Sequence, residues 1–129
     1  MSEPDSIGTL PTRVIIVDDN RDFREVLATL LPRILEVEIV ATFENAPPAL
    51  EFLRGDSNVT VLVDNKMPGM DGITFIGLTQ KLDPKPPVFL VSFSPLPEHR
   101  NAAFEAGATG VLNKTDVQED LKRYFQPLA

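Results

Sequence analysis

Three aspartates, a serine and a lysine follow short apolar runs of this sequence, where their side chains could act together. Asp18 and Asp19 follow VIIV, Asp64 follows VTVLV, Ser92 follows VFLV, and Lys114 lies just beyond VL. Each has a simple structural explanation, since Asp and Ser are common helix caps and a lysine near the end of a chain is often a solvated surface residue. If the runs are parallel strands, however, these side chains meet at one edge of a sheet.

The carboxylates determine which ion such a site could bind. Two carboxylates about 4 Å apart repel by about 4 kcal/mol at an effective dielectric constant of about 20, so a pocket with three of them must raise a pKa or bind a cation. The sequence has no cysteine and one histidine, His99, and oxygen ligands favour a hard ion such as Mg²⁺. A metal, the Lys114 ammonium and the Ser92 hydroxyl around one carboxylate suit phosphoryl transfer, which depends mostly on positioning and charge neutralisation. Asp64 is the expected nucleophile, because carboxylates form aspartyl-phosphate intermediates.

Five apolar runs rich in β-branched residues predict the strands that position these groups. They cover residues 14–17, 37–43, 59–63, 88–91 and 111–112. The first, third and fourth runs are nearly continuous rather than alternating, which is typical of strands buried on both faces of a parallel sheet.

Segments with helical periodicity separate the strands. We expect helices over 23–34, 47–53, 73–82, 97–106 and 116–125. Pro32 should kink or end the first helix early, and Gly107 should stop the fourth. Asp116 should cap the fifth, with Glu119 completing a capping box. Strands that alternate with helices predict a doubly wound α/β domain, with a five-stranded parallel sheet and helices on both faces. Such sheets bind ligands beyond the carboxyl ends of their strands.

Length and charge limit the remaining functions. A chain of 129 residues is expected to form one domain, with residues 1–12 as a polar tail and 13–129 as the domain. The net charge of −7 argues against direct nucleic-acid binding, because phosphate contacts need a basic face. No apolar run approaches the roughly 18–20 residues of a membrane span, and the N-terminus lacks the pattern of a secretory signal. We therefore expect a cytoplasmic protein without membrane insertion.

Four motifs together resemble a known family. VIIVDD (14–19), VDNKMPGMDG (63–72), VFLVS (88–92) and EAGATGVLNK (105–114) have the order and spacing of response-regulator receiver domains of two-component signalling, such as the chemotaxis response regulator. The resemblance extends from about Arg13 to Phe125. It implies a flavodoxin-like (βα)5 fold with strand order 2-1-3-4-5.

The resemblance also implies a role for each residue at the rim. Asp64 matches the phosphoacceptor and, with Asp19, a carboxylate ligand of Mg²⁺, while Asp18 acts largely through bound water. The main-chain carbonyl of Lys66 matches the third protein ligand. Ser92 matches the switch hydroxyl, and Lys114 matches the lysine that pairs with a phosphoryl oxygen.

The partners implied are those of the family. The phosphodonor is a sensor histidine kinase or a histidine phosphotransfer protein, and small acyl phosphates also serve. The output is a protein contact made by the fourth helix, fifth strand and fifth helix of a monomer or weak homodimer. The chain is thus expected to be a switch that phosphorylates and dephosphorylates itself, not a turnover enzyme.

Four positions depart from the usual receiver pattern. Val111 stands where the family often has an aromatic that swings inward on phosphorylation. Thr115 replaces a proline that often follows the lysine in a cis peptide, and a non-proline cis bond costs about 3 kcal/mol. Phe93 stands where a small residue is usual and could narrow donor access. The Lys66 side chain could either affect hydrolysis or be simply solvated.

Other readings of the sequence fit less well. A haloacid-dehalogenase-type phosphatase needs a second aspartate where Lys66 stands, and the Asp-Asp-Asn-Arg sequence after the first strand would repel the phosphate of a flavodoxin ligand. A degenerate receiver used only for binding is the non-chemical alternative, although Asp18, Asp19, Asp64, Ser92 and Lys114 are all present. A stand-alone receiver is favoured over the receiver of a DNA-binding regulator without its output domain, because no basic recognition helix follows.

Overall fold

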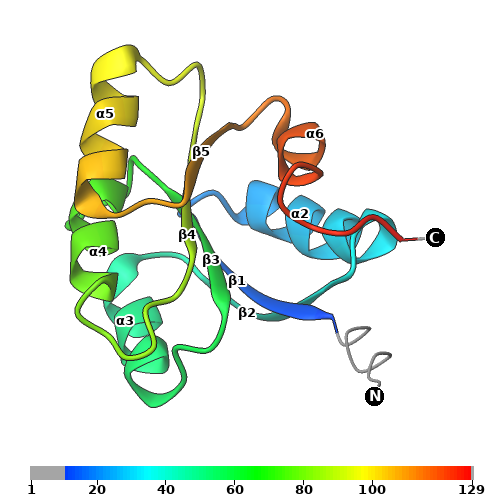
Figure 1. Cartoon of the computed structure of the whole chain (residues 1–129), viewed down its shortest axis with the longest axis horizontal. Coiled ribbons are helices and arrows are strands. Elements are labelled where there is room, and N and C mark those ends of the chain that lie inside the picture. The colour runs from blue at the N-terminus through cyan, green and yellow to red at the C-terminus, as the bar shows by residue number, and fades with distance from the viewer. Residues whose placement is uncertain (1–10, 129) are drawn as a thin grey trace.

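The computed structural model describes residues 11–128 and contains five strands that alternate with five helices (Figure 1). Most of the predicted polar tail, residues 1–10, lies outside the described residues. The elements are β1 (Thr12–Val17), α2 (Arg21–Ile34), β2 (Val37–Phe43), α3 (Ala46–Gly55), β3 (Thr60–Asp64), α4 (Gly72–Thr79), β4 (Val88–Ser92), α5 (Pro97–Ala106), β5 (Gly110–Asn113) and α6 (Val117–Leu121).

All strand pairs are parallel, and the sheet order is β2-β1-β3-β4-β5. This confirms the predicted doubly wound fold and its strand order. The order reverses between β1 and β3, which pair with each other from Val14–Thr60 to Val17–Val63. The carboxyl ends of these two strands therefore mark the place where a ligand is expected to bind.

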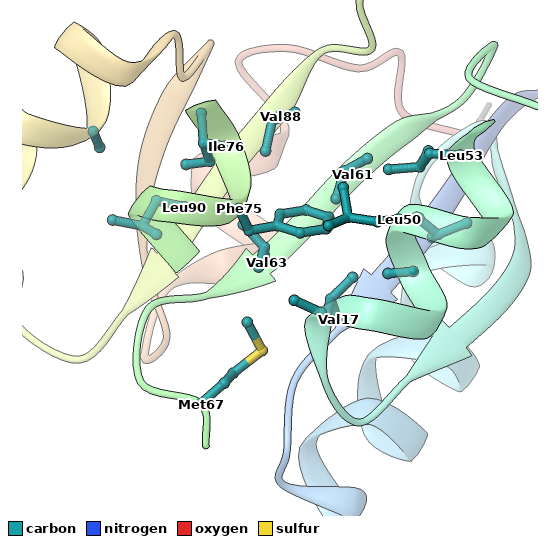
Figure 2. Close-up of a cluster of buried hydrophobic side chains, with 14 of the residues drawn as sticks. Val17, Leu50, Leu53, Val61, Val63, Met67, Phe75, Ile76, Val88 and Leu90 are labelled. Carbon is teal, nitrogen blue, oxygen red and sulfur yellow. The ribbon is translucent and has the colours of Figure 1, made fainter. Parts of the chain in front are cut away.

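Each strand of the sheet interior buries side chains on both faces, as the continuous apolar runs predicted. Ile15 and Val17 of β1 belong to one apolar cluster with α3, α4 and α5, whereas Val14 and Ile16 belong to a second cluster with α2 and α6. Figure 2 shows part of the first cluster, in which the Phe75 ring lies among valines of the strands and leucines of α3. The sheet is thus held rigidly between two helical layers (Figure 1).

Pro32 does not end the first helix early, as the sequence had suggested. Helix α2 continues through Pro32 to Ile34, and the Leu35 amide still donates to the Leu31 carbonyl at 2.9 Å. Because the proline lies in the last turn, it removes only the bond that its own N–H would have donated.

Helices α4 and α6 are shorter than predicted. The chain after Thr79 continues as turns, with Lys81 and Leu82 donating to the carbonyls three residues before them. After Leu121 the chain runs back along the start of β2. There Glu36 donates to the Gln126 carbonyl, and Leu128 donates to the Ile34 carbonyl. Residues 122–125, the end of the expected helix, form turns, and this backbone pairing, which includes an antiparallel bridge at Leu35–Pro127, begins directly after them.

The predicted capping box of α6 is wrong. Asp116 precedes the helix, but its side chain makes no capping hydrogen bond. Its Oδ2 lies 3.4 Å from the Thr115 hydroxyl oxygen, and Glu119 pairs with Lys122 at 2.9 Å. The prediction for Gly107 is confirmed, since it ends α5 with a left-handed φ of 116°.

Within the described residues, no helix is long and apolar enough to cross a membrane.

Candidate functional site

Asp18 is fixed at the end of β1 by bonds to both its backbone and its side chain. Its amide donates to the Phe43 carbonyl at 2.9 Å, and its Oδ1 accepts from the Asn20 amide at 2.8 Å. The Arg24 guanidinium donates to the Asp18 carbonyl at 2.7 Å. The side chain is buried, whereas that of the neighbouring Asp19 is exposed. The two adjacent carboxylates therefore have different environments, one held inside and one open to solvent.

Asp64 is the last residue of β3, and the loop that follows packs directly against its backbone. A β-carbon at Gly72 would lie 2.5 Å from the Asp64 carbonyl oxygen, so only glycine allows this approach. The Gly72 amide donates to the Asn65 carbonyl at 3.0 Å, and Gly69 has a φ of 83°, which favours glycine. Met67 inserts its side chain into the core and anchors the middle of the loop (Figure 2). The backbone at Asp64 is thus fixed by strand β3 before it and by the packed loop after it.

The three aspartates meet as the sequence predicted. Asp18, Asp19 and Asp64 each offer an oxygen, and these atoms lie within 4.8 Å of one another. The Oδ2 atom of Asp18 is buried, and a cation already contacts it, because the Lys114 ammonium lies 2.8 Å away. Oxygen ligands in this number fit Mg²⁺, which keeps several of its waters when a few carboxylates bind it. Lys66 is exposed in the loop after Asp64, and its carbonyl stays a predicted ligand.

Lys114 joins two of the three carboxylates. Its Nζ lies 2.8 Å from Asp18 Oδ2 and 3.3 Å from Asp64 Oδ1. Its side chain is only 7% exposed, and its ammonium lies over the rings of Phe23 and Phe93. The lysine therefore offsets part of the negative charge of the cluster from inside the protein.

The environment of Asp64 raises its pKa above the usual value for an aspartate. Burial is the largest cause and repulsion by Asp18 the second, with a smaller contribution from Asp19. The charge and hydrogen bond of Lys114 act in the opposite direction without cancelling the increase. The carboxylate is therefore under electrostatic strain that a bound cation would relieve.

Ser92 reaches the same rim but does not contact the acids in this conformation. It is the last residue of β4, and its carbonyl accepts from the Lys114 amide at 2.9 Å. Its hydroxyl donates to the Phe93 carbonyl at 3.5 Å, and within residues 11–128 it makes no hydrogen bond to a carboxylate. Ser92 and Lys114 are thus joined through the backbone, while the hydroxyl remains free to rotate toward another acceptor.

The structure shows the conformation or the burial of three positions that depart from the receiver pattern. Among the described residues the only cis peptide is Asp83–Pro84, so the Lys114–Thr115 peptide is trans. The amide and the hydroxyl of Thr115 both donate to Asn113 Oδ1, at 3.0 and 2.8 Å. Val111 is buried in β5, while Phe93 projects into solvent. The loop after the lysine is therefore shaped by a side-chain turn at Asn113.

Two residues near the site were missed in the sequence. Phe23 and Arg24 follow the acid pair by about one helical turn; the Phe23 ring lies against the Lys114 ammonium, and Arg24 donates to the Asp18 carbonyl. From the sequence alone, Phe23 is only part of the first expected helix, and Arg24 has no assigned role. Their spacing from Asp19 carried the available signal, because residues four and five positions after a strand-end acid lie in the first turns of the next helix.

Comparisons with known proteins assign the chain to one family. The family model described as response regulator receiver domain matches residues 14–126. A protein-glutamate methylesterase/protein-glutamine glutaminase of Rhodopseudomonas palustris is 36% identical over 106 residues, which cover 81% of this chain and 29% of that protein. The chain therefore spans less than a third of that relative's length.

Solved structures agree with the family match. The signal receiver domain of the putative response regulator NarL from Mycobacterium tuberculosis has a TM-score of 0.75 and 27% identity, covering 88% of this chain and 94% of that one. A chain of the complex between the P1 domain of CheA3 and CheY6 from R. sphaeroides has a TM-score of 0.72 and 28% identity, covering 88% of this chain and 95% of that one.

Proposed function

Because the chain belongs to the response regulator receiver domain family, we propose that Asp64 accepts a phosphoryl group and that the phosphorylated domain signals by protein contact. The observation that supports this most strongly is the group of charged side chains around the Asp64 carboxylate. Asp64 lies beside two further acids and 3.3 Å from the buried Lys114 ammonium.

In the proposed reaction, a carboxylate oxygen of Asp64 attacks the phosphorus of the donor. A new O–P bond forms while the bond to the donor's leaving group breaks, and the leaving group takes the bonding electrons. Mg²⁺, when bound, neutralises charge on the phosphoryl oxygens. Lys114, whose ammonium already lies 3.3 Å from Asp64, pairs with one of these oxygens. Ser92 rotates its hydroxyl from the Phe93 carbonyl to the phosphoryl group.

Asp18, Asp19 and Asp64, together with the Lys66 carbonyl, are the proposed protein ligands of Mg²⁺. The gathering of three carboxylates within 4.8 Å and the raised pKa of Asp64, which Lys114 does not cancel, both support a further cation at this place. Because a cation stabilises the ionised carboxylate, its binding should lower the pKa that burial raises.

The donor proposed for Asp64 is a phosphohistidine on a sensor kinase or a phosphotransfer domain. The similarity to a chain from the complex of the P1 domain of CheA3 with CheY6 supports a protein partner of this kind. This role would place residues 13–129 in the cytoplasm as a receiver domain, with α5, β5 and α6 as the face that contacts the downstream protein. The chain itself would act as a switch and not as a turnover enzyme.

Intact mass spectrometry tests this proposal. The protein is incubated with acetyl phosphate and Mg²⁺, and Asp64→Asn is treated in parallel. We expect one added phosphoryl mass on the wild-type chain and none on the variant. EDTA should abolish labelling while the circular dichroism spectrum stays unchanged. Equal labelling of Asp64→Asn, or no labelling of the wild type, would contradict the proposal.

A further inference from the structure

The ammonium of Lys114 lies between two aromatic rings that come from different parts of the chain. Its Nζ is 4.6 Å from the centroid of the Phe23 ring in α2 and 5.3 Å from that of Phe93 in the loop after β4. Both distances fall within the roughly 6 Å over which a cation is attracted to the face of a ring. The three residues therefore form a cluster, which we name the aromatic clamp: Phe23, Phe93 and Lys114.

Packing explains one of these rings but not the other. Phe23 packs against the apolar cluster on the α2 and α6 side of the sheet. Phe93 belongs to neither apolar cluster and is 66% exposed. An exposed phenylalanine that contributes nothing to the core, yet lies over a buried ammonium, points to a role at the site.

The ion pairs of Lys114 cannot by themselves hold it beside Asp64 once a cation binds. Asp18 and Asp64 are its two ion-pair partners, and both also belong to the group of acids that could bind a metal ion. A divalent cation on these oxygens competes with the ammonium and repels it. The two ring faces are partners that the metal ion does not take, because it binds oxygen ligands.

We propose that Phe23 and Phe93 are positioning residues for Lys114, holding its ammonium beside Asp64 when a divalent cation occupies the carboxylates. The inference rests on the proposed function only in assigning Lys114 to the phosphoryl group. The geometry of the clamp can be tested without any phosphoryl transfer.

The direct test is the NMR signal of the Lys114 side chain in the full chain. Protons on a methylene beside a ring face are shifted upfield by the ring current, and Lys114→Arg identifies the signal by its disappearance. We expect an upfield shift of the Lys114 Hε protons that persists when Mg²⁺ is added to saturation. The Phe93→Leu variant should keep the fold and lose the part of the shift that comes from Phe93, while the nearer Phe23 ring maintains the rest. A wild-type signal that moves to the position of a solvated lysine when Mg²⁺ is added would overturn the proposal.

A second test separates the electronic effect of the ring from its apolar volume. Phe93→Leu should slow labelling by acetyl phosphate at saturating Mg²⁺ by about two- to fivefold, the fold-change expected from losing one exposed cation–ring contact. Phe93→Tyr should restore nearly the wild-type rate, because it keeps the ring. Phenylalanine analogues with increasing fluorination at position 93 should slow the reaction stepwise, since fluorine weakens the negative ring face at nearly constant shape.

These outcomes distinguish the clamp from the proposed function. If the wild type is labelled at Asp64 and the fluorinated series has a constant rate, the clamp is contradicted and the proposed function stands. If no variant is labelled but the Lys114 shift persists in Mg²⁺, the positioning by the rings stands and the proposed function fails.

Discussion

The two sides of the candidate site differ in how firmly they are held. On the acid side, Asp18 and Asp64 are buried, and hydrogen bonds or close backbone packing fix the chain around them. On the side of β4, Ser92 makes one long hydrogen bond, Phe93 and Leu96 are exposed, and Ser94 has a left-handed φ of 42°. The carboxylates are therefore fixed in one arrangement, whereas the hydroxyl of Ser92 and the chain that follows it have fewer contacts that would oppose a change of conformation.

Removal of the Lys114 ammonium should destabilise the acid side of the site more than any other change considered. Lys114→Met leaves Asp18 and Asp64 buried close together without their ion-pair partner. We expect it to lower the free energy of unfolding by about 3 kcal/mol at neutral pH, as for other broken buried ion pairs. Urea unfolding measures this loss, and Mg²⁺ should restore part of it.

The matched control for this variant is Lys122→Met. Lys122 pairs with Glu119 at 2.9 Å on the exposed surface of α6, and such pairs contribute about 0–1 kcal/mol. Equal destabilisation by the two variants would show that Lys114 does not compensate buried charge.

A β-carbon at Gly72 tests whether the loop after Asp64 is closely fixed. Gly72→Ala places this atom 2.5 Å from the Asp64 carbonyl and 2.9 Å from Asn65 Cα, so we expect a loss of about 1–3 kcal/mol from overpacking. Gly77→Ala is the control in the same helix. Its β-carbon meets nothing within 4 Å, and better helix propensity should stabilise the fold by up to about 1 kcal/mol. If both variants were stabilised, the close approach at Gly72 would be refuted.

The raised pKa of Asp64 predicts how stability changes with pH. A carboxyl whose pKa is higher in the folded state than in the unfolded state destabilises the fold above that pKa, and the penalty disappears as pH falls through it. Asp64→Asn should therefore unfold at higher urea concentration than the wild type at neutral pH without Mg²⁺. This advantage should shrink in acid, whereas the exposed Asp116→Asn should show no comparable trend. A gain that is independent of pH would contradict the prediction.

The smallest expected change in stability concerns Ser94, in the segment that follows β4. Ser94→Gly removes a side chain from a left-handed backbone position, and the relief, offset by the flexibility of glycine, should stabilise the fold by about 0.5 kcal/mol. Ser94→Ala keeps the β-carbon and should give no gain in the same thermal unfolding measurement. If Ser94→Ala stabilised the fold as much as Ser94→Gly, the left-handed φ would not be its cause.

The sequence predicted the fold well because its strands are buried on both faces. Continuous apolar runs such as 14–17 and 61–63 leave little doubt about a parallel sheet, and a parallel sheet brings strand ends together. Asp18, Asp19 and Asp64 could therefore be predicted as neighbours before any coordinates were known.

Features that depend on tertiary contacts were not predictable in this way. The position of Phe23 over Lys114 joins residues far apart in the chain, and helical periodicity shows only that Phe23 is apolar. The pairing of residues 126–127 with Leu35 and Glu36, shortly after the early end of α6, is a tertiary contact that no local pattern reveals. The absence of a capping bond from Asp116 was also not predictable, because helix propensity does not show that the turn before α6 is instead organised by the side chain of Asn113.

The most direct test of the central claim is to identify the phosphorylated residue chemically. After treatment with acetyl phosphate and Mg²⁺, borohydride reduces an aspartyl phosphate to homoserine, which peptide mass spectrometry locates. The proposed function predicts homoserine at position 64 and at no other aspartate. Homoserine at Asp18 or Asp19, or none at any position despite a folded protein with Mg²⁺ present, would contradict it.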